Sequence, residues 1–499
     1  MRKITRREVL TAAAAGLTRA RAAAADELAL MDATAQAEMV RKGKVSALEL
    51  VDAAIRRIEK TNPQLNAVVW ERFEKARGEA RAALPQGPFT GVPFLTKDLG
   101  CTTEGEPDSQ GSRFLKNARY LARVTTELAR RIRQAGFINL GRTNTPEFGV
   151  LATTEPVAWG PTRNPWDPTR TPAGSSGGAG AAVAALMTPV AHGSDGGGSI
   201  RNPAAACGLV GLKPSRGRLS LAPGDDITIP LAVQGFLTRS VRDTAAGLDL
   251  ASGPALGDPA APPSPLRPYV QELAANPGKL RIGLLNRLPR SVEGQIDPIC
   301  KQAVEEAGKL MESLGHRVEL AHPPGMDDEK ATGTWRRIFA VRVFYSFRSF
   351  EQRVGRAAAR DEIEPSAAFF FDLARNMSAL DYVQALDEMN AFTRQFAAWW
   401  REGFDLLLTP MTGTVTPKLG VLGLDPARMP ASTHWTPFGR HFNLSGQPAI
   451  SLPLHWTGEG LPIGIQLGAA YGREDLLIRV AAQLERARPW HKRIPPVHG

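Results

Sequence analysis

The sequence has 499 residues, of which 43% are hydrophobic, so the chain is long enough to bury a large core. Its 48 glycines and 39 prolines stay below the share that is typical of disordered or collagen-like chains. The net charge of +11 would suit a nucleic acid or an anionic membrane, but lysine and arginine alternate with acidic residues and form no long basic stripe. We therefore expect no nucleic-acid partner. The three cysteines, Cys101, Cys207 and Cys300, are far apart, which excludes a disulfide framework and a paired-cysteine metal site but leaves one bridge open.

The first residues resemble a targeting signal. Arg6 and Arg7 stand before a weakly apolar stretch, and a run of alanines ending at Ala25 offers small residues for cleavage. Arg19 and Arg21 interrupt this stretch, which leaves it too short and too charged to span a bilayer. We predict a twin-arginine (Tat) signal over 1–25, a mature domain over 26–499 that is periplasmic or secreted, and no stable membrane insertion. The alternatives are a basic N-terminus without function and a cytoplasmic protein.

Helical and extended patterns alternate along the rest of the chain. The amphipathic patterns and capping signals predict helices over 32–42, 46–60, 71–83, 126–134, 179–187, 296–314, 379–402 and 473–486. Short apolar runs predict strands over 90–98, 137–141, 189–195, 281–285, 316–320, 404–410 and 462–468. We expect Asn62-Pro63 to stop the second helix, and the proline-rich segments 161–172 and 253–279 to be surface loops. This order predicts a single α/β domain with a mixed, twisted β-sheet covered by helices on both sides.

Two clusters of glycine and serine, GSSGG over 174–178 and GGGSI over 196–200, flank one of the predicted helices. Glycine permits backbone amides to lie bare against a ligand, so the two clusters indicate a site built largely from main chain. A flexible linker is the alternative, but the apolar segment between the clusters disfavours it. The first cluster also fits the nucleophile-elbow pattern G-x-S-x-G with Ser176 as nucleophile, although no strand precedes it. A phosphate-binding P-loop is excluded because no Lys-Ser or Lys-Thr follows the glycines.

The second cluster and one lysine together suggest nucleophilic chemistry. Successive amides of Gly196, Gly197, Gly198 and Ser199 would form a nest that faces an oxyanion. A serine hydroxyl needs a base, and Lys97 can serve if burial lowers its pKa. The apolar residues before Lys97 offer such burial, while strand alternation would send Asp98 to the opposite face. From local sequence alone, the alternative is that Lys97 and Asp98 form an ordinary pair on the surface at the end of a strand.

Lys97, the GSSGG cluster and the run DGGGSIRNPAAACGLVGLKPSRGRLS over 195–220 resemble the amidase signature family. The spacings agree with its pattern, since Lys97 and Ser175 lie 78 positions apart and Ser175 and Ser199 lie 24 apart. The resemblance covers nearly the whole mature chain. It implies a Ser-Ser-Lys triad, an acyl-enzyme and neither metal nor cofactor. The residues it implies are Ser199 as nucleophile, Ser175 as bridging serine on a cis peptide, Lys97 as base, Gly196, Gly197 and Gly198 as oxyanion-binding, Ser176, Asp195 and Arg201 as supporting, and His192 as structural.

Within that family, segments 153–166, 442–453 and 469–485 resemble the bacterial hydrolases of aminohexanoate cyclic dimer. The region from about 325 to 435, where we expect substrate contacts, resembles them much less and has no cysteine, and the export signal is a further departure. The acyl and amine groups of the substrate therefore stay open. Five aromatic residues are candidates for an apolar pocket or for the core: Trp335, Phe339, Trp399, Trp400 and Trp435.

The sequence thus predicts a serine hydrolase of small or linear amides. Its expected partner is a small-molecule amide substrate, and whether it forms a homodimer is left open. One alternative is a protein similar to the glutaminase component of the tRNA-dependent amidotransferase, which the predicted export signal disfavours. Another is a carbamate or ester hydrolase on the same fold, and a third is a catalytically silent binding protein, which the intact triad disfavours.

Overall fold

The computed structural model describes residues 27–224, 231–423 and 425–499. The predicted signal over 1–25 lies outside these residues. Within them, no helix combines the length and the apolar character needed to cross a membrane.

The described strands form one mixed sheet of eleven strands, in the order β1-β3-β2-β4-β6-β5-β10-β11-β9-β7-β8. β2 runs parallel to both β3 and β4, and β7 runs parallel to β8 and β9, while the other neighbours are antiparallel. The strands are β1 Val68–Glu71, β2 Pro93–Lys97, β3 Ile138–Thr143, β4 Val190–Asp195, β5 Val210–Lys213, β6 Val233–Thr238, β7 Arg281–Leu284, β8 Arg317–Leu320, β9 Leu406–Pro410, β10 Ala449–Trp456 and β11 Pro462–Ala469.

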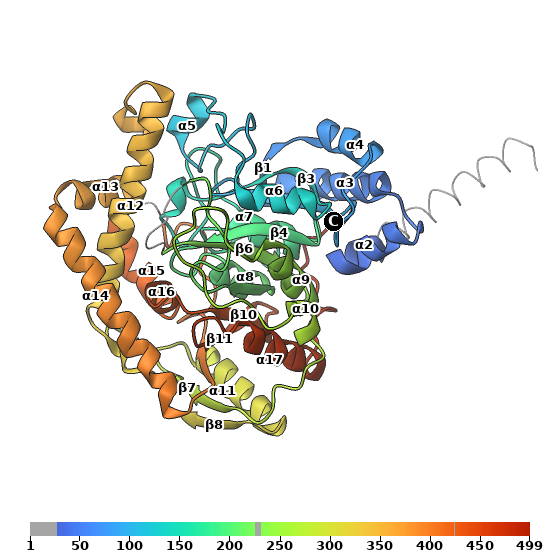
Figure 1. The fold of residues 1–499 in the computed structure, drawn as a ribbon. Coiled ribbons are helices and arrows are strands. Elements are labelled where there is room, and N and C mark those ends of the chain that lie inside the picture. The colour runs from blue at the N-terminus through green and yellow to red at the C-terminus, as the bar shows by residue number, and fades with distance from the viewer. Residues whose placement is uncertain (1–26, 225–230, 424) are drawn as a thin grey trace, which may run out of the picture.

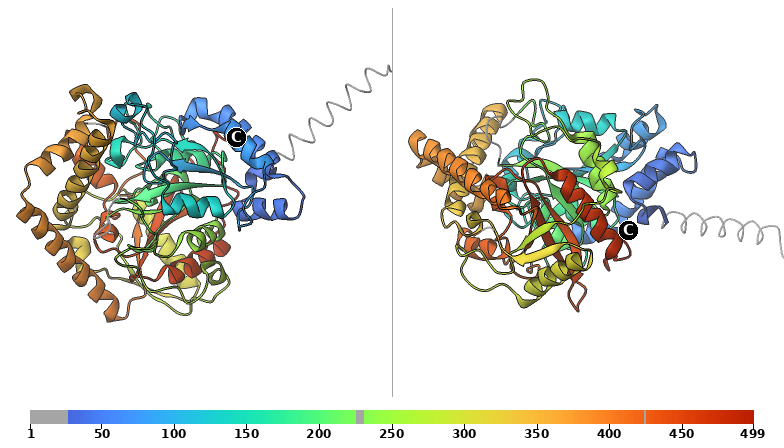
Figure 2. Two further views of the ribbon diagram at one scale, coloured as in Figure 1. Left: turned by 45° about the horizontal axis from the view of Figure 1, so that its top comes forward. Right: turned by 60° about the horizontal axis from the view of Figure 1, so that its bottom comes forward.

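Helices cover both faces of this sheet, as Figures 1 and 2 show. Successive side chains of a strand point to opposite faces, so Phe94 and Phe236 join one core cluster while Leu95 and Leu237 join another. The first cluster is closed by α2 Ala33–Arg41, α6 Glu127–Gln134, α9 Val241–Ala251, α11 Pro298–Ser313 and α17 Glu474–Ala487. The second is closed by α3 Ala47–Leu65, α4 Phe73–Arg81, α7 Gly177–Ala184 and α8 Arg201–Cys207. This arrangement confirms the predicted α/β fold class.

A helical arm stands beside the sheet and appears in yellow and orange at the left of Figure 1. Its members pack on one another and on α16 through two clusters of aromatic and aliphatic side chains. The two further views in Figure 2 also show the arm to one side of the sheet. The arm consists of α12 Ala331–Val354, α13 Pro365–Arg375 and α14 Ala379–Ala398, next to α15 Met429–Trp435 and α16 Arg440–Leu444. The sequence predicted only α14 among these helices.

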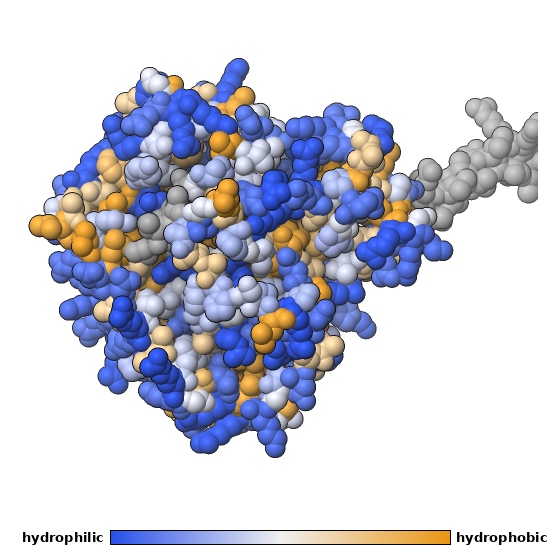
Figure 3. Space-filling view, viewed as in Figure 1, coloured by the Kyte–Doolittle hydropathy of each residue, from blue (hydrophilic) through white to orange (hydrophobic). Residues whose placement is uncertain are grey.

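The remaining elements are short. They are α5 Arg113–Asn117, α10 Tyr269–Glu272 and the 3₁₀ helices η1 Glu147–Gly149, η2 Pro324–Asp327, η3 Arg360–Glu362, η4 Trp399–Glu402 and η5 Pro426–Arg428. The surface is mostly hydrophilic in Figure 3, with hydrophobic side chains in small groups. One such group lies at the left, over the arm, where Leu380 and Val383 of α14 are exposed.

Two local predictions were wrong. Pro63 does not stop α3, which continues to Leu65, because a proline so close to the end of a helix disturbs little of its backbone hydrogen bonding. Asn66, in the left-handed conformation, then closes the helix, and its amide donates to the Asn62 carbonyl at 2.7 Å. The segment 253–279 is not loop throughout, since α10 forms where the Asp249 carboxylate accepts the amides of Tyr269 and Val270. The helix predicted over 379–402 ends at Ala398, and η4 follows it.

Candidate active site

The predicted site residues meet at one edge of the sheet. Lys97 is the last residue of β2, and Asp195 is the last residue of β4. Because β2 and β4 are parallel neighbours, their carboxyl ends lie side by side, and the GSSGG cluster approaches the same edge before α7 begins. There the chain surrounds a cavity of about 350 Å³, whose lining includes Ser175 and Ser199.

Lys97 is completely buried and touches two serines. Its Nζ donates to Ser175 Oγ at 2.7 Å and to Ser194 Oγ at 2.9 Å. Burial disfavours the ammonium form and lowers the pKa of Lys97 to about 7, although the nearby Asp195 carboxylate acts in the opposite direction. A large fraction of this lysine is therefore neutral near pH 7. Asp98 faces away from it, and its carboxylate accepts the amide of Ser109.

The GSSGG cluster is held by close backbone packing. The peptide bond between Gly174 and Ser175 is cis, in agreement with what the family resemblance implies. Glycine is required here because a Cβ on Gly174 would lie 2.6 Å from the Thr153 carbonyl oxygen, and one on Gly178 would lie 2.3 Å from the Asn144 nitrogen. The cluster therefore places Ser175 through main-chain contacts that no larger residue allows.

Ser176 fastens this cluster to β4. Its Oγ donates to the carbonyl of Ser194 and accepts the amide of the same residue, both at 3.2 Å. It is fully buried, and no strand precedes it, so the structure contradicts the nucleophile-elbow hypothesis for Ser176.

Asp195 organises the second cluster. Its carboxylate accepts the amides of Gly198 at 2.7 Å and Ile200 at 3.1 Å, and it pairs with Arg201 at 2.9 Å. Burial alone would raise the pKa of Asp195, but the Arg201 charge outweighs it and lowers that pKa. Arg201 in turn donates to Gln466 and Asn443, so the loop is tied to β11 and α16.

The nest differs from the prediction at one position. The amide of Gly198 donates to Asp195 and does not face the cavity. Within the described residues the amides of Gly196, Gly197 and Ser199 donate no hydrogen bond, and these three residues line the cavity. The free amides therefore belong to Gly196, Gly197 and Ser199.

Ser199 follows these glycines and is partly exposed to the cavity. Among the described residues nothing forms a hydrogen bond with its hydroxyl, while its carbonyl accepts the amide of Ser176 at 3.3 Å. The hydroxyl is thus available to a bound molecule.

His192 is structural in its contacts, as the sequence interpretation held. Its Nδ1 accepts the amide of Lys97 at 3.2 Å, and its Nε2 lies 2.7 Å from Gln234 Oε1. Burial lowers the pKa of His192 to about 3, so the ring is neutral.

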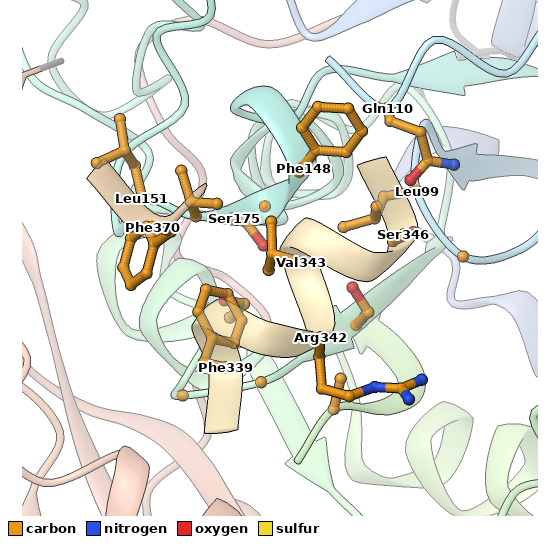
Figure 4. A pocket seen from close by; sticks show the side chains of 18 of the residues that line it. Leu99, Gln110, Phe148, Leu151, Ser175, Phe339, Arg342, Val343, Ser346 and Phe370 are labelled. Carbon is orange, nitrogen blue, oxygen red and sulfur yellow. The ribbon is translucent and has the colours of Figure 1, made fainter. Parts of the chain in front are cut away.

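The cavity wall opposite the serines comes mainly from the arm. Phe339 and Val343 of α12 point toward Ser175, with Phe148 and Phe370 around them (Figure 4). Of the five aromatic candidates, Trp335 and Phe339 line the cavity, whereas Trp399, Trp400 and Trp435 pack in hydrophobic clusters outside its lining.

Several polar residues of this site were not predicted from the sequence, among them Ser194, Arg336 and Arg440. Ser194 holds the Lys97 side-chain nitrogen, and its place in the run SDGGGS was the only signal available. Arg336 and Arg440 line the cavity, and no motif marks them.

No group of three His, Cys, Asp or Glu side chains that could hold a metal ion occurs in the described part of the chain. The three cysteines are buried free thiols. Burial raises the pKa of Cys101 and of Cys300 to about 12, so both stay protonated.

Comparisons with known proteins agree with this geometry. Residues 49–478 match the model of a family described as Amidase. The 6-aminohexanoate-cyclic-dimer hydrolase of Paenarthrobacter ureafaciens is 42% identical over 476 residues, which cover 93% of this chain and 96% of the relative.

Solved structures are similar over the same length. A 6-aminohexanoate cyclic dimer hydrolase complexed with substrate superposes with a TM-score of 0.91 at 41% identity, covering 94% of this chain and 100% of that one. A bacterial aryl acylamidase of the amidase signature family gives a TM-score of 0.83 at 28% identity, covering 92% and 96%. These similarities confirm the resemblance that the sequence motifs indicated.

Proposed function

Because the chain belongs to the amidase family and is a hydrolase of amide C–N bonds, we propose that it acts through a triad of Ser199, Ser175 and Lys97. The observation that carries this proposal is the buried Lys97, whose nitrogen lies 2.7 Å from Ser175 Oγ beside the cavity that Ser199 also lines. A neutral amine in that position can accept a proton from Ser175, and the Ser175 hydroxyl can in turn accept a proton from Ser199.

Acylation follows from this arrangement. Neutral Lys97 takes the Ser175 proton while Ser175 takes the proton of Ser199, and the Ser199 oxygen attacks the amide carbonyl carbon. The carbonyl oxygen becomes an oxyanion, which the free amides of Gly196, Gly197 and Ser199 stabilise. Each such donor contributes on the order of 3 kcal/mol to transition-state stabilisation in serine hydrolases.

The tetrahedral intermediate then breaks its C–N bond. The proton held by Lys97 returns through Ser175 to the leaving nitrogen, which departs as an amine and leaves an ester on Ser199. Water attacks this ester with the same groups as base and acid, and the carboxylic acid is released. The residues that supply these steps are all present on this chain.

We propose small amides, linear or cyclic, as substrates. The cavity supports this because it is of small-molecule size and has a largely apolar wall. Esters and carbamates present the same carbonyl to Ser199 and are the second class to assay. A role as an amidotransferase component is the less favoured alternative, because the 42%-identical relative is named as a hydrolase.

The test is Ser199→Ala against amide substrates such as anilides and aminohexanoate oligomers. We expect turnover to fall at least on the order of 10⁴-fold, with an unchanged circular dichroism spectrum. Ser313→Ala, an exposed serine on α11, is the matched control and should keep full activity. Substantial amidase turnover in Ser199→Ala would refute the triad.

For localisation, we propose export through the twin-arginine route on the basis of Arg6 and Arg7. The protein should reach the periplasmic fraction without its first residues, and Arg6→Lys with Arg7→Lys should keep it in the cytoplasm. Recovery of periplasmic protein that still carries Met1 would contradict cleavage.

A further inference from the structure

Two of the arginines that line the cavity, Arg336 and Arg440, lie beside the second glycine-serine cluster and have no carboxylate partner among the described residues. Arg440 begins α16 and Arg336 lies on α12, and both line the cavity. Across the described ranges, neither guanidinium forms an ion pair, and the one hydrogen bond that either of them makes runs from Arg440 Nη1 to Thr332 Oγ1 at 3.2 Å. Both cations are therefore available to an anion that enters the cavity.

The situation of Arg440 differs from that of two other buried arginines, Arg201 and Arg218. Arg201 and Arg218 hold carboxylates at 2.9 and 3.0 Å. Arg440 is only 9% exposed, and it packs over the Trp335 ring with its Cζ 5.6 Å from the ring centroid. A buried charge without a partner is costly, and an anion bound in the cavity would supply the missing counter-charge.

The charge of Arg336 also weakens the hold of Arg440 on its proton. Burial lowers the pKa of Arg440 to about 10, and the charge of Arg336 acts in the same direction. The guanidinium groups are thus close enough to repel, and an anion between them would relieve this repulsion.

Both residues adjoin the nest that faces the scissile carbonyl. Gly439, directly before Arg440, packs against the second cluster so closely that a Cβ on it would lie 2.5 Å from the Gly197 carbonyl oxygen. Trp335, directly before Arg336, donates from Nε1 to the Gly196 carbonyl at 2.7 Å. The cationic wall and the reacting centre are therefore parts of one cavity.

The wall of the cavity between the two arginines and Ser175 is largely apolar. Phe339 and Val343 of α12 face the cavity and point toward Ser175 (Figure 4). Among the described residues, the aspartates of the lining, Asp108 and Asp425, form no ion pair with either arginine. An apolar chain that ends in an anionic group would match the apolar wall with its chain and the two arginines with its charge.

We propose that the cavity takes amides that carry a carboxylate at the end of a short apolar chain, and that Arg440 and Arg336 bind this carboxylate. The inference rests on the proposed amidase function and adds the substrate class to it. A guanidinium matches a carboxylate through two parallel hydrogen bonds, which gives orientation as well as affinity. The carboxylate would fix the chain so that its amide carbonyl lies at Ser199.

The test compares substrates that differ only in the terminal group. On the acyl side, hexananilide is paired with adipic acid monoanilide, and on the amine side, N-acetylhexylamine is paired with N-acetyl-6-aminohexanoate. For at least one pair we expect kcat/KM to favour the carboxylate by about tenfold or more. Arg440→Gln and Arg336→Gln should each lower kcat/KM for that carboxylate substrate about 10- to 100-fold, mainly through KM, and change the neutral substrate less than about threefold.

Matched variants make the result decisive. Arg428→Gln removes an exposed arginine of η5 outside the lining and should keep the preference. If Arg440→Gln does not fold, Arg336→Gln decides, since Arg336 is only partly buried. The subsite is refuted if neither pair shows a preference for the carboxylate, or if the preference survives in both variants. Hydrolysis of the neutral anilide by the wild type, lost in Ser199→Ala, would then still support the proposed function.

Discussion

The two sides of the cavity are built on different principles. The side formed by β2, β4, α7 and α8 uses small residues, backbone contacts and hydrogen-bonded buried charges, as in the pair of Asp195 and Arg201. The side formed by the arm and α16 uses long side chains, several of them aromatic, and includes Arg336 and Arg440, which pair with no carboxylate in the described part of the chain. Chemistry needs reacting groups within about 3 Å of one another, which requires the closely packed side built from small residues and backbone contacts. Recognition of a substrate tolerates the looser side built from long side chains.

After the loss of the proposed nucleophile in Ser199→Ala, the largest expected effect is at the proposed base. Lys97→Ala removes the proton acceptor of the proposed triad, and we expect kcat/KM to fall about 10²- to 10⁴-fold. Ser194→Ala removes only the second hydroxyl held by Lys97 and should cost far less. Steady-state kinetics on an anilide measures both, and equal losses would mean that Ser194 belongs to the proton path.

The next effect is on stability. Arg201→Met leaves the Asp195 carboxylate buried without its counter-charge, and we expect a loss of about 3–5 kcal/mol in the free energy of unfolding. Arg473→Met breaks the exposed pair with Asp475 and should cost less than about 1 kcal/mol. Urea denaturation followed by fluorescence compares the two, and similar losses would contradict the contrast between the sides of the cavity.

A smaller effect tests the backbone packing. Gly178→Ala places a Cβ 2.3 Å from the Asn144 nitrogen, and overpacking of this kind costs about 1–3 kcal/mol. Gly78→Ala lies in α4 with nothing within 4 Å, so it should stabilise the protein by about 0.5–1 kcal/mol. Thermal unfolding distinguishes the two, and a neutral Gly178→Ala would show that the cluster has space in solution.

The pH profile sharpens the assignment of the base. Since the pKa of Lys97 is lowered to about 7 and only the neutral amine accepts a proton, kcat/KM should rise about tenfold per pH unit below 7 and level off above it. A profile without an inflection between pH 6 and 8 would contradict this role.

Unfolding must be separated from that profile. Burial raises the pKa of Glu147 to about 7 and that of Glu364 to about 8, so each contributes stability that is complete below pH 4.5, declines as the pH rises and is lost above 7 to 8. Their contribution to stability therefore falls over the pH range in which the activity is expected to rise. Melting temperatures at each pH provide the control.

The smallest effect is expected on the arm side. Val343→Ala enlarges the apolar wall near Ser175, and we expect KM for hexananilide to rise about two- to tenfold with little change in kcat. A hundredfold fall in kcat would mean that the arm positions the reacting groups and does not merely bind the chain.

Much of the fold was predictable because its elements carry strong local signals. The capping box at Ser46 and Glu49 begins α3 as predicted, and the apolar runs at β4, β7, β9 and β11 form strands. The helices α12 and α13 were missed. In α12, buried and partly exposed aromatic residues such as Phe347 and Phe344 follow one another, so no clean amphipathic pattern marks it.

The sequence by itself located the proposed site. Two glycine-serine clusters and Lys97 at the end of an apolar run name the residues, because glycine and a buried lysine are costly where no site requires them. Only the tertiary structure decided which groups are free. The carboxylate of Asp195 accepts the amide of Gly198, Ser194 accepts a hydrogen bond from Lys97, and Arg440 meets no carboxylate among the residues that the structure describes. These outcomes depend on where side chains from distant elements point, and local sequence does not contain that information.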